Sequence, residues 1–422
     1  MDEITARTYT EILHDELKMA MGCTEPIAIA YCAAYAKQLL GKMPETCDVF
    51  CSGNIIKNVK AVTVPQTGGL KGIEVAALAG ILGGDAEKEL QVLSSVTDED
   101  RAEIRRWLSA GIVRVHVLDS THLLHIITVL RAGADEVSVE IVDGHTTLGD
   151  VVRNGETLHT RKQEQDRQSH LRYDLLNIYD ILQYADMVDL HEVSPVLENQ
   201  LQKNNSIALE GLTNDWGAEV GKTLLQWETD GIWTRAKAMA AAGSDARMNG
   251  CAMPVVINSG SGNQGLTVSL PVKVYAEEKG YSHERLLRAL CVSNLVAIRQ
   301  KRGIGKLSAF CGAVCAAVGA VSGIAYLNGE SYQVIAQTII NALASIGGMI
   351  CDGAKSSCAG KIASALDCAF LSYQMAKNGF GYQDGEGLVK VDVETTIECI
   401  GNVARNGMRS TDQEVLREMI AI

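Results

Sequence analysis

Hydrophobic residues recur at helical spacing along the first part of the chain. Apolar positions between Ile12 and Leu40 fall mostly three or four residues apart, which predicts helical structure over residues 3–42. Gly41 is typical of a helix stop, because glycine readily adopts the left-handed conformation that ends many helices. Pro26 lacks a backbone N–H and lies inside this pattern. We therefore expect a break near this proline.

The next segment carries the residue types of β-structure. β-Branched residues with Gly-Asn punctuation predict strands or extended loops over residues 46–66, and two short helices separated by Gly83 and Gly84 follow. Three further β-rich runs are separated by turn residues and lie at 113–118, 123–131 and 137–143. This arrangement predicts an antiparallel meander in a small α/β module.

Beyond about residue 165 the pattern is mostly helical to the end of the sequence. It is interrupted by glycine-rich loops at 259–265, 347–360 and 379–387. The highly charged segment 159–170 is typical of a solvated connection between modules. We therefore predict an α+β fold with a mainly helical body and a smaller α/β module that contains an antiparallel sheet. The predicted division is residues 1–45 and 166–422 for the body and 46–165 for the module.

One stretch matches a membrane-spanning helix in length. Residues 308–327 carry no charge, and Gly319 and Gly323 form a GxxxG motif of the kind found in transmembrane helix pairs. The stretch is nevertheless rich in Ala, Gly, Ser and Cys, and no second span of similar length accompanies it. We favour a fully buried helix whose small residues let neighbouring helices approach closely, and no membrane partner.

Composition narrows the class of protein. The chain has 422 residues, 47% of them hydrophobic, and a formal net charge of −13. It is long enough to bury sizeable cores, and its acidity argues against nucleic acid, whose phosphates need a basic face. The first 22 residues lack a basic start followed by an apolar core, so we expect no secretory signal and a cytoplasmic protein. A small molecule is the favoured partner.

The sequence SGSGNQG at 259–265 formally satisfies the dinucleotide-binding pattern through Gly260, Gly262 and Gly265. That pattern needs a helix to begin there within a β-α-β unit, whereas Pro271 follows closely and the surrounding chain is helical. A loop of exposed backbone N–H groups with polar side chains suits a carboxylate better. The simpler alternative is a tight structural turn.

The twelve cysteines raise a second possibility for chemistry. In a reducing compartment they are poor candidates for a disulfide framework, and no Cys-x-x-Cys pair indicates zinc. Iron–sulfur sites accept ligands from distant segments, so Cys311, Cys351 and Cys358 can hold three irons of a four-iron cluster and leave one open. Cys23 lies apart, near the start. Most of the others, including Cys32 and Cys399, are expected in the core.

Longer motifs identify a resemblance. They are GCTEPIAIA at 22–30, PQTGGLKGIEVAALAG at 65–80, SGSGNQG at 259–265, KLSAFCGAV at 306–314 and CDGAKSSCAGK at 351–361. Together they cover segments along nearly the whole chain and resemble the L-cysteine desulfidase family, which is related to the alpha chain of bacterial iron–sulfur L-serine dehydratases.

The resemblance implies a 4Fe-4S cluster held by three cysteines, without pyridoxal phosphate. The implied reaction is β-elimination of L-cysteine to sulfide, ammonia and pyruvate. By matching motif positions, Cys311 and Cys351 are the expected ligands. The third is Cys358 if the serine dehydratase pattern holds, whereas Cys23 can instead be a ligand or a thiolate base. The burial that a cluster requires, together with the small-residue helices, favours a homodimer.

The implied chemistry assigns further roles. An open iron can bind the substrate thiol as a Lewis acid, and a base must remove the Cα proton; Cys23 and Glu25 are the candidates. The substrate carboxylate is expected to bind the loop and a nearby lysine, namely Ser259, Ser261, Gly262, Asn263 and Lys355. Two histidines three residues apart in a strand usually lie on opposite faces, so His122 and His125 are not expected to bind metal.

Other functions compete with this interpretation. The same cluster chemistry can dehydrate L-serine. A pyridoxal-phosphate enzyme can run the same elimination, but its lysine is expected shortly before the loop, and MAAAGSDARMNG does not supply one. A metal-thiolate sensor or storage protein is the remaining alternative, and it has no need of a carboxylate-binding loop.

Overall fold

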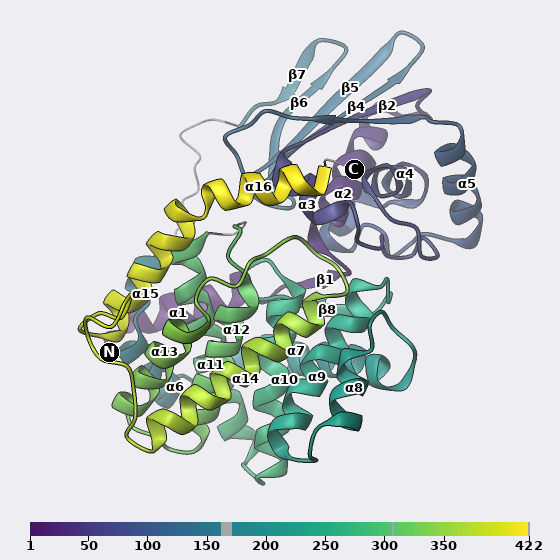
Figure 1. Ribbon diagram of the computed structural model, residues 1–422. Coiled ribbons are helices and arrows are strands. Elements are labelled where there is room, and N and C mark those ends of the chain that lie inside the picture. Colours follow the sequence, from purple (N-terminus) through teal and green to yellow (C-terminus); the bar gives the residue numbers. More distant parts are fainter. Residues whose placement is uncertain (162–170, 306–307, 421–422) are drawn as a thin grey trace.

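The computed structural model describes residues 1–161, 171–305 and 308–420, and it has two regions (Figure 1). A helical body forms the larger region, and a sheet module lies against one end of it. Each region has its own large cluster of buried hydrophobic side chains. This arrangement confirms the predicted α+β class.

The helical body gathers helices from both ends of the described chain. Its elements are α1 (Glu3–Glu16), the short 3-10 helix η3 (Tyr173–Leu175), α6 (Ile178–Met187), α7 (Leu190–Thr213), α8 (Val220–Trp227), α9 (Ile232–Met248), α10 (Gly262–Glu278), α11 (His283–Ile304), α12 (Gly312–Leu327), α13 (Tyr332–Ile346), α14 (Cys358–Lys377) and α15 (Val393–Asn402). Helix α12 contacts α10, α11, α13 and α14, so it forms the centre of this region.

The small residues of α12 explain its position. Every side chain from Ala313 to Leu327 is buried. A Cβ atom added to Gly319 would lie 2.4 Å from the Ser293 carbonyl oxygen, and one added to Gly323 would lie 2.8 Å from that of Ala289. The GxxxG motif therefore lets α12 pack closely on α11, as expected for a buried helix. Within the described ranges, no helix is both long and apolar enough to cross a membrane.

The sheet module contains a six-stranded mixed sheet. Its strands are β2 (Thr46–Cys51), β3 (Val113–Val117), β4 (His125–Ala132), β5 (Asp135–Val142), β6 (Leu148–Arg153) and β7 (Glu156–His159), in the order β3-β2-β4-β5-β6-β7. Strand β2 pairs antiparallel with β4, and the neighbouring strands from β4 to β7 also pair antiparallel. Strands β2 and β3 pair in parallel. The expected meander is therefore wrong at its first step, because β2 lies between the runs at 113–118 and 123–131.

Helices cover the sheet. They are α2 (Thr24–Leu40), α3 (Gly53–Val59), α4 (Ile73–Gly83), the 3-10 helix η1 (Ala86–Gln91) and α5 (Asp98–Ser109). Helix α2 packs against β4, β5 and α4, and its side chains belong to the sheet module's core. The sequence pattern assigns residues 1–45 to the helical body. In the structure, residues 24–40 share the core of the sheet module. The division into domains remains a prediction.

The ends of α2 follow sequence chemistry. Gly41 caps the helix with φ = 73°, as expected. Pro26 lies in the first turn, where its missing N–H costs no helical hydrogen bond. The break between α1 and α2 therefore precedes this proline and contains β1 (Met19–Met21). Strand β1 pairs antiparallel with β8 (Pro254–Val256), which joins the start of the chain to the helical body.

The C-terminal segment connects the two regions a second time. After the π-helical turn η4 (Val403–Gly407), α16 (Arg409–Ile420) extends from the body to α3 of the sheet module (Figure 1). Its Asp412 forms an ion pair with the buried Lys57. Most of the predicted solvated connection, residues 162–170, lies outside the described residues.

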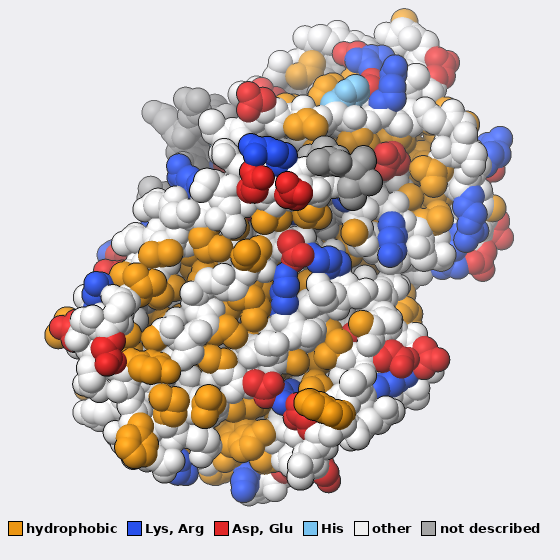
Figure 2. All heavy atoms as spheres, in the orientation of Figure 1, with side chains coloured by type: hydrophobic (Ala, Val, Ile, Leu, Met, Phe, Trp, Pro, Cys, Tyr) orange, Lys and Arg blue, Asp and Glu red, His pale blue; other side chains and the backbone are white. Residues whose placement is uncertain are grey.

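Hydrophobic side chains gather on the surface of the body around α13, α14 and α15, as Figure 2 shows. Leu371, Phe380 and Val391 are among the exposed apolar residues of this part of the chain. Surfaces of this kind often mark contacts with another protein. The homodimer remains a prediction.

Candidate active site between the two regions

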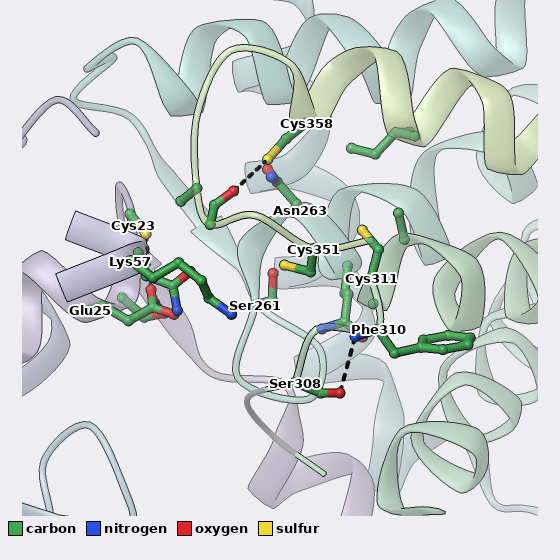
Figure 3. A pocket seen from close by; sticks show the side chains of 18 of the residues that line it. Cys23, Glu25, Lys57, Ser261, Asn263, Ser308, Phe310, Cys311, Cys351 and Cys358 are labelled. Atoms are coloured by element: carbon green, nitrogen blue, oxygen red, sulfur yellow. Dashed lines mark hydrogen bonds between the residues drawn. The ribbon is translucent and has the colours of Figure 1, made fainter. Parts of the chain in front are cut away.

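A cavity of about 110 Å³ lies where the sheet module meets the helical body (Figure 3). Cys23, Glu25 and Lys57 lie on one side of it, and the three candidate cluster ligands lie across from them. The expected site residues that line this cavity are Cys23, Glu25, Ser261, Asn263, Cys311, Cys351 and Cys358. The fold therefore brings together segments that are more than 300 residues apart in sequence.

A short backbone bridge positions the first two thiols. Phe310 pairs with Ile350, the Cys311 N–H donates to the Met349 carbonyl at 2.8 Å, and the Cys351 N–H donates to the Ala309 carbonyl at 2.6 Å. Cys311 is also the N-terminal cap of α12. The bridge therefore places Cys311 and Cys351 beside each other although 40 residues separate them.

A hydrogen bond joins these two thiols and shifts their pKa values in opposite directions. The Cys311 thiol donates to Cys351, which lowers the pKa of Cys351 to about 5, and the charges of Lys57 and Lys301 act in the same direction. The same bond, together with burial, raises the pKa of Cys311 well above its usual value. The hydrogen bond therefore favours the thiolate form of Cys351 over that of Cys311.

The third candidate ligand begins α14. Cys358 Sγ lies 3.7 Å from the Gly353 carbonyl oxygen, and burial raises the pKa of this thiol. Gly353 has φ = 90°, and a Cβ atom on it would lie 2.3 Å from the Lys57 carbonyl oxygen. Only glycine lets the cysteine loop approach α3 so closely. The loop that carries Cys351 and Cys358 thus packs directly on the sheet module.

Cys23 and Glu25 form the opposite side. Cys23 caps the N-terminus of α2, and its thiol donates a hydrogen bond to Glu25 Oε2 at 2.9 Å. The Thr24 hydroxyl lies 3.1 Å from the same carboxylate oxygen. Burial, and then the charge of Glu25, raises the pKa of Cys23 well above its usual value. Cys23 is therefore a protonated donor to the Glu25 carboxylate in this structure.

The SGSGNQG segment differs from its sequence-based description. Helix α10 begins at Gly262, inside the loop predicted over 259–265, and continues through Pro271. The preceding strand β8 belongs to a two-stranded antiparallel sheet with β1, so the segment does not form the β-α-β unit that dinucleotide binding needs. Ser259 adopts φ = 50° in the turn before the helix.

A buried amide network holds this turn. The Asn258 side-chain amide donates to the Asn294 side chain at 2.9 Å, and Asn294 exchanges two hydrogen bonds with Gln200. Ser259 Oγ donates to Asn258 Oδ1 at 2.9 Å. These satisfied buried polar groups fix the loop whose Ser261 and Asn263 reach the cavity.

Three of the five expected carboxylate-binding residues, Ser259, Gly262 and Lys355, do not line this cavity. Ser259 lines a neighbouring cavity of about 310 Å³, which Glu25 and Ser261 also line. Lys355 does not contact the first cavity, and its ammonium pairs with Asp352 at 2.6 Å. Its role as a carboxylate ligand remains a prediction, and Lys361 is held by the same aspartate.

Three basic residues of the site escaped the sequence analysis. Lys57, Arg247 and Lys301 all line the cavity and are almost fully buried. The only sequence signal for Arg247 is a charged residue at the end of a run of small residues in α9, MAAAGSDARM. Lys57 and Lys301 lie in ordinary mixed segments, so their positions follow only from the tertiary fold.

The two histidines of the sheet module also differ from expectation. Their ring centres lie 5.6 Å apart in an edge-to-face contact, so His122 and His125 do not lie on opposite faces. The reason is that β4 begins only at His125, and His122 lies in the preceding turn. Each ring is hydrogen-bonded to a carboxylate, His122 to Asp143 at 2.7 Å and His125 to Glu140 at 2.6 Å.

The donor set fits an iron–sulfur cluster better than a single metal ion. No group of three or more His, Cys, Asp or Glu side chains in residues 1–161, 171–305 and 308–420 is arranged to hold one ion. A four-iron cluster has a different requirement, because each cysteine binds its own iron. Cys311, Cys351 and Cys358 supply three thiols to one cavity, and nearby lysines favour the thiolate form of Cys351.

Comparison with known proteins identifies the family of the chain. The model of the serine dehydratase alpha chain family matches residues 87–417. The chain is 49% identical to a UPF0597 protein of Lachnoclostridium phytofermentans, and the alignment covers 97% of this chain and 98% of the relative. It is 48% identical to a UPF0597 protein of Finegoldia magna, with 98% and 99% covered.

A third relative is more distant but equally complete. A UPF0597 protein of Treponema denticola is 43% identical over 100% of this chain and 99% of its own length. The family match includes the segments that carry all three candidate cluster ligands and Arg247, whereas Cys23, Glu25 and Lys57 precede it. The chain therefore belongs to the serine dehydratase alpha chain family, together with the UPF0597 proteins.

Proposed function

We propose that this chain is an iron–sulfur-dependent lyase that removes sulfide from L-cysteine and yields pyruvate and ammonia. Its family makes it a lyase of the serine dehydratase type. The observation that carries the finer proposal is the convergence of Cys311, Cys351 and Cys358 with the hydrogen-bonded Cys23–Glu25 pair in one cavity. This combination offers ligands for a Lewis acid and a base facing them.

The residues divide the work of an elimination. Cys311, Cys351 and Cys358 would hold a 4Fe-4S cluster, which would supply a Lewis acid for the departing sulfur of the substrate. Glu25 is the base in this proposal, because its carboxylate accepts hydrogen bonds and can accept the Cα proton. The pair of electrons released at Cα forms the double bond as sulfide leaves.

Cys23 acts on the base in this scheme. Its raised pKa disfavours a thiolate, and its thiol donates to Glu25, so it orients the carboxylate. This engagement of Cys23 favours Cys358 as the third cluster ligand. The aminoacrylate product then tautomerises to an imine, which water hydrolyses to pyruvate and ammonia.

The test is the release of pyruvate by anaerobically purified protein given L-cysteine, L-serine or D-cysteine, with iron and sulfide assayed on the same sample. We expect about four irons per chain. We expect a kcat/KM for L-cysteine at least about tenfold above that for L-serine, because a thiolate suits iron in a sulfide-rich cluster. Faster turnover of L-serine would instead support the dehydratase alternative, and iron without turnover would support a sensor.

A further inference from the structure

Two buried cations line the cavity without a carboxylate partner. Arg247 is 3% exposed and Lys301 is 6% exposed. In the part of the chain that the structure describes, neither side chain lies within ion-pair distance of Asp or Glu, whereas the third buried cation, Lys57, pairs with Asp412. Burial of an unpaired charge is costly unless a ligand completes it. The cavity is therefore built to receive negative charge.

The two cations face different parts of the site. Lys301 lies near the cluster ligands, since its charge acts with the Cys311 hydrogen bond to lower the pKa of Cys351. The charge of Arg247 instead acts on Cys23, where it opposes the effects of burial and Glu25. Arg247 thus lies toward the Cys23–Glu25 side of the cavity, and it forms no ion pair with a described carboxylate.

The guanidinium of Arg247 is packed against Gly262 at its Nε and held at its Nη1, and its Nη2 donates to no described residue. Its Nη1 donates to Asn263 Oδ1 at 3.1 Å, whereas the buried Nε has no hydrogen-bond partner. A Cβ atom on Gly262 would lie 2.3 Å from that Nε, so this position must remain glycine for the arginine to fit. Asn263 and Gly262 of the SGSGNQG segment therefore serve to position Arg247.

A further polar atom of the cavity lacks a partner. The side-chain oxygen of Gln264 is buried and makes no hydrogen bond with a described residue. Gln264 lies against Gly312, where a Cβ atom would approach its amide carbon to 2.6 Å. The cavity thus offers a guanidinium donor and an amide acceptor, which match the carboxylate and the ammonium of an α-amino acid.

We propose that Arg247, which lines the cavity, binds the α-carboxylate of the substrate through its terminal guanidinium nitrogens, in the role that the sequence suggested for Lys355. This inference rests on the proposed reaction only for the identity of the substrate. An arginine edge can donate two parallel hydrogen bonds to a carboxylate, which fixes orientation as well as position. Arg247 of the helical body then binds the substrate, and Glu25 of the sheet module removes its proton in the same cavity.

Binding of two thiol ligands tests the proposal without turnover. 3-Mercaptopropionate carries a thiol and a carboxylate, whereas cysteamine carries a thiol and an amine but no carboxylate. Their Kd values are measured by calorimetry under argon on the iron-loaded wild type and on Arg247→Gln. We expect the variant to bind 3-mercaptopropionate at least about tenfold more weakly, the scale of a lost charged hydrogen bond, and cysteamine within about twofold of the wild type.

Matched variants exclude a general loss of structure. Arg235→Gln removes an arginine from the same helix, but one that is paired with Glu278 at the surface, and it should leave both Kd values unchanged. Arg247→Lys keeps the charge and loses the two-donor edge, so an intermediate Kd is expected. Equal weakening of both ligands in Arg247→Gln, or selective loss of 3-mercaptopropionate binding in Lys355→Gln alone, would overturn the proposal.

The proposed carboxylate site and the proposed reaction can fail independently of each other. If the wild type binds 3-mercaptopropionate through Arg247 but releases no pyruvate from L-cysteine, the carboxylate site stands and the reaction does not. If L-cysteine turns over but Arg247→Gln keeps its preference for 3-mercaptopropionate over cysteamine, the reaction stands and this carboxylate site is wrong.

Discussion

The two sides of the cavity have different chemical character. The helical body contributes the thiols Cys311, Cys351 and Cys358 together with the unpaired Arg247 and Lys301. The sheet module contributes a carboxylate, Glu25, that accepts hydrogen bonds from its neighbours, and a lysine already paired with Asp412. One side is suited to hold a cluster and an anion, and the other is suited to move a proton.

This difference follows the architecture. Each region buries its own large hydrophobic core, and a small buried cluster of Cys23, Val62 and Met248 lies between them. The site forms only where α2 and α3 meet the loop of residues 351–358. Substitution of the thiols on the helical body should therefore remove bound iron. Substitution of Glu25 on the sheet module should lower activity and leave the iron in place.

Loss of a thiol from the body should have the largest effect. We expect Cys311→Ser and Cys351→Ser to lose bound iron and to reduce lyase activity by at least about a thousandfold, because a metal contributes several kcal/mol to such a step. Iron analysis and pyruvate release under argon measure both. Cys32→Ser and Cys399→Ser are the controls, since Cys32 is buried beneath the sheet and Cys399 lies in α15. Full iron content in Cys351→Ser would remove this residue from the ligand set.

Loss of the carboxylate from the sheet module should separate chemistry from iron. We expect Glu25→Gln to keep its iron and absorption spectrum but to lower kcat about 10²- to 10⁴-fold, the usual contribution of a general base. Glutamine preserves the size of the side chain and still accepts hydrogen bonds from Cys23 and Thr24. The wild-type rate in Glu25→Gln would assign the base elsewhere.

The sequence predicted this division only in part. Cys311, Cys351, Cys358, Cys23 and Glu25 stand in recognisable local motifs, and all of them reach the cavity. The basic residues were not predictable, because Lys57 and Lys301 become part of the site only through contacts between distant helices. Lys355 has the more suggestive local sequence, but Asp352 three residues away pairs with it.

The same contrast applies to the fold. Local patterns predicted the helical body, the buried α12 and the cap at Gly41, because periodicity and glycine conformation are local properties. They did not predict that β2 would separate β3 from β4, since strand order depends on pairing over long sequence distances. Helix α2 likewise shares the sheet module's core, although it directly follows an element of the helical body.

Substitution of Cys23 tests whether this residue orients Glu25 or binds the cluster. If it orients Glu25, Cys23→Ala should keep the iron and lower kcat about tenfold, the cost of one hydrogen bond to a charged group. Cys358→Ser should then lose iron as the ligand variants do. Iron content and kcat are measured on the same anaerobic samples. The reverse pattern, iron lost from Cys23→Ala and kept by Cys358→Ser, would make Cys23 the third ligand.

The last prediction concerns the stability of the contact between the two sides and not catalysis. The Lys57 side chain is 1% exposed and the side chain of its partner Asp412, on α16, is 16% exposed. Asp412→Asn leaves a buried ammonium without a carboxylate, so we expect the free energy of unfolding to fall by about 3 kcal/mol, the lower end for breaking a buried ion pair. Urea denaturation measures this change. Glu414→Gln is the matched control, because it breaks an exposed pair with Arg417 on the same helix and should cost about 0.5 kcal/mol or less. Equal effects of the two substitutions would show that α16 does not fasten the sheet module to the body through Lys57.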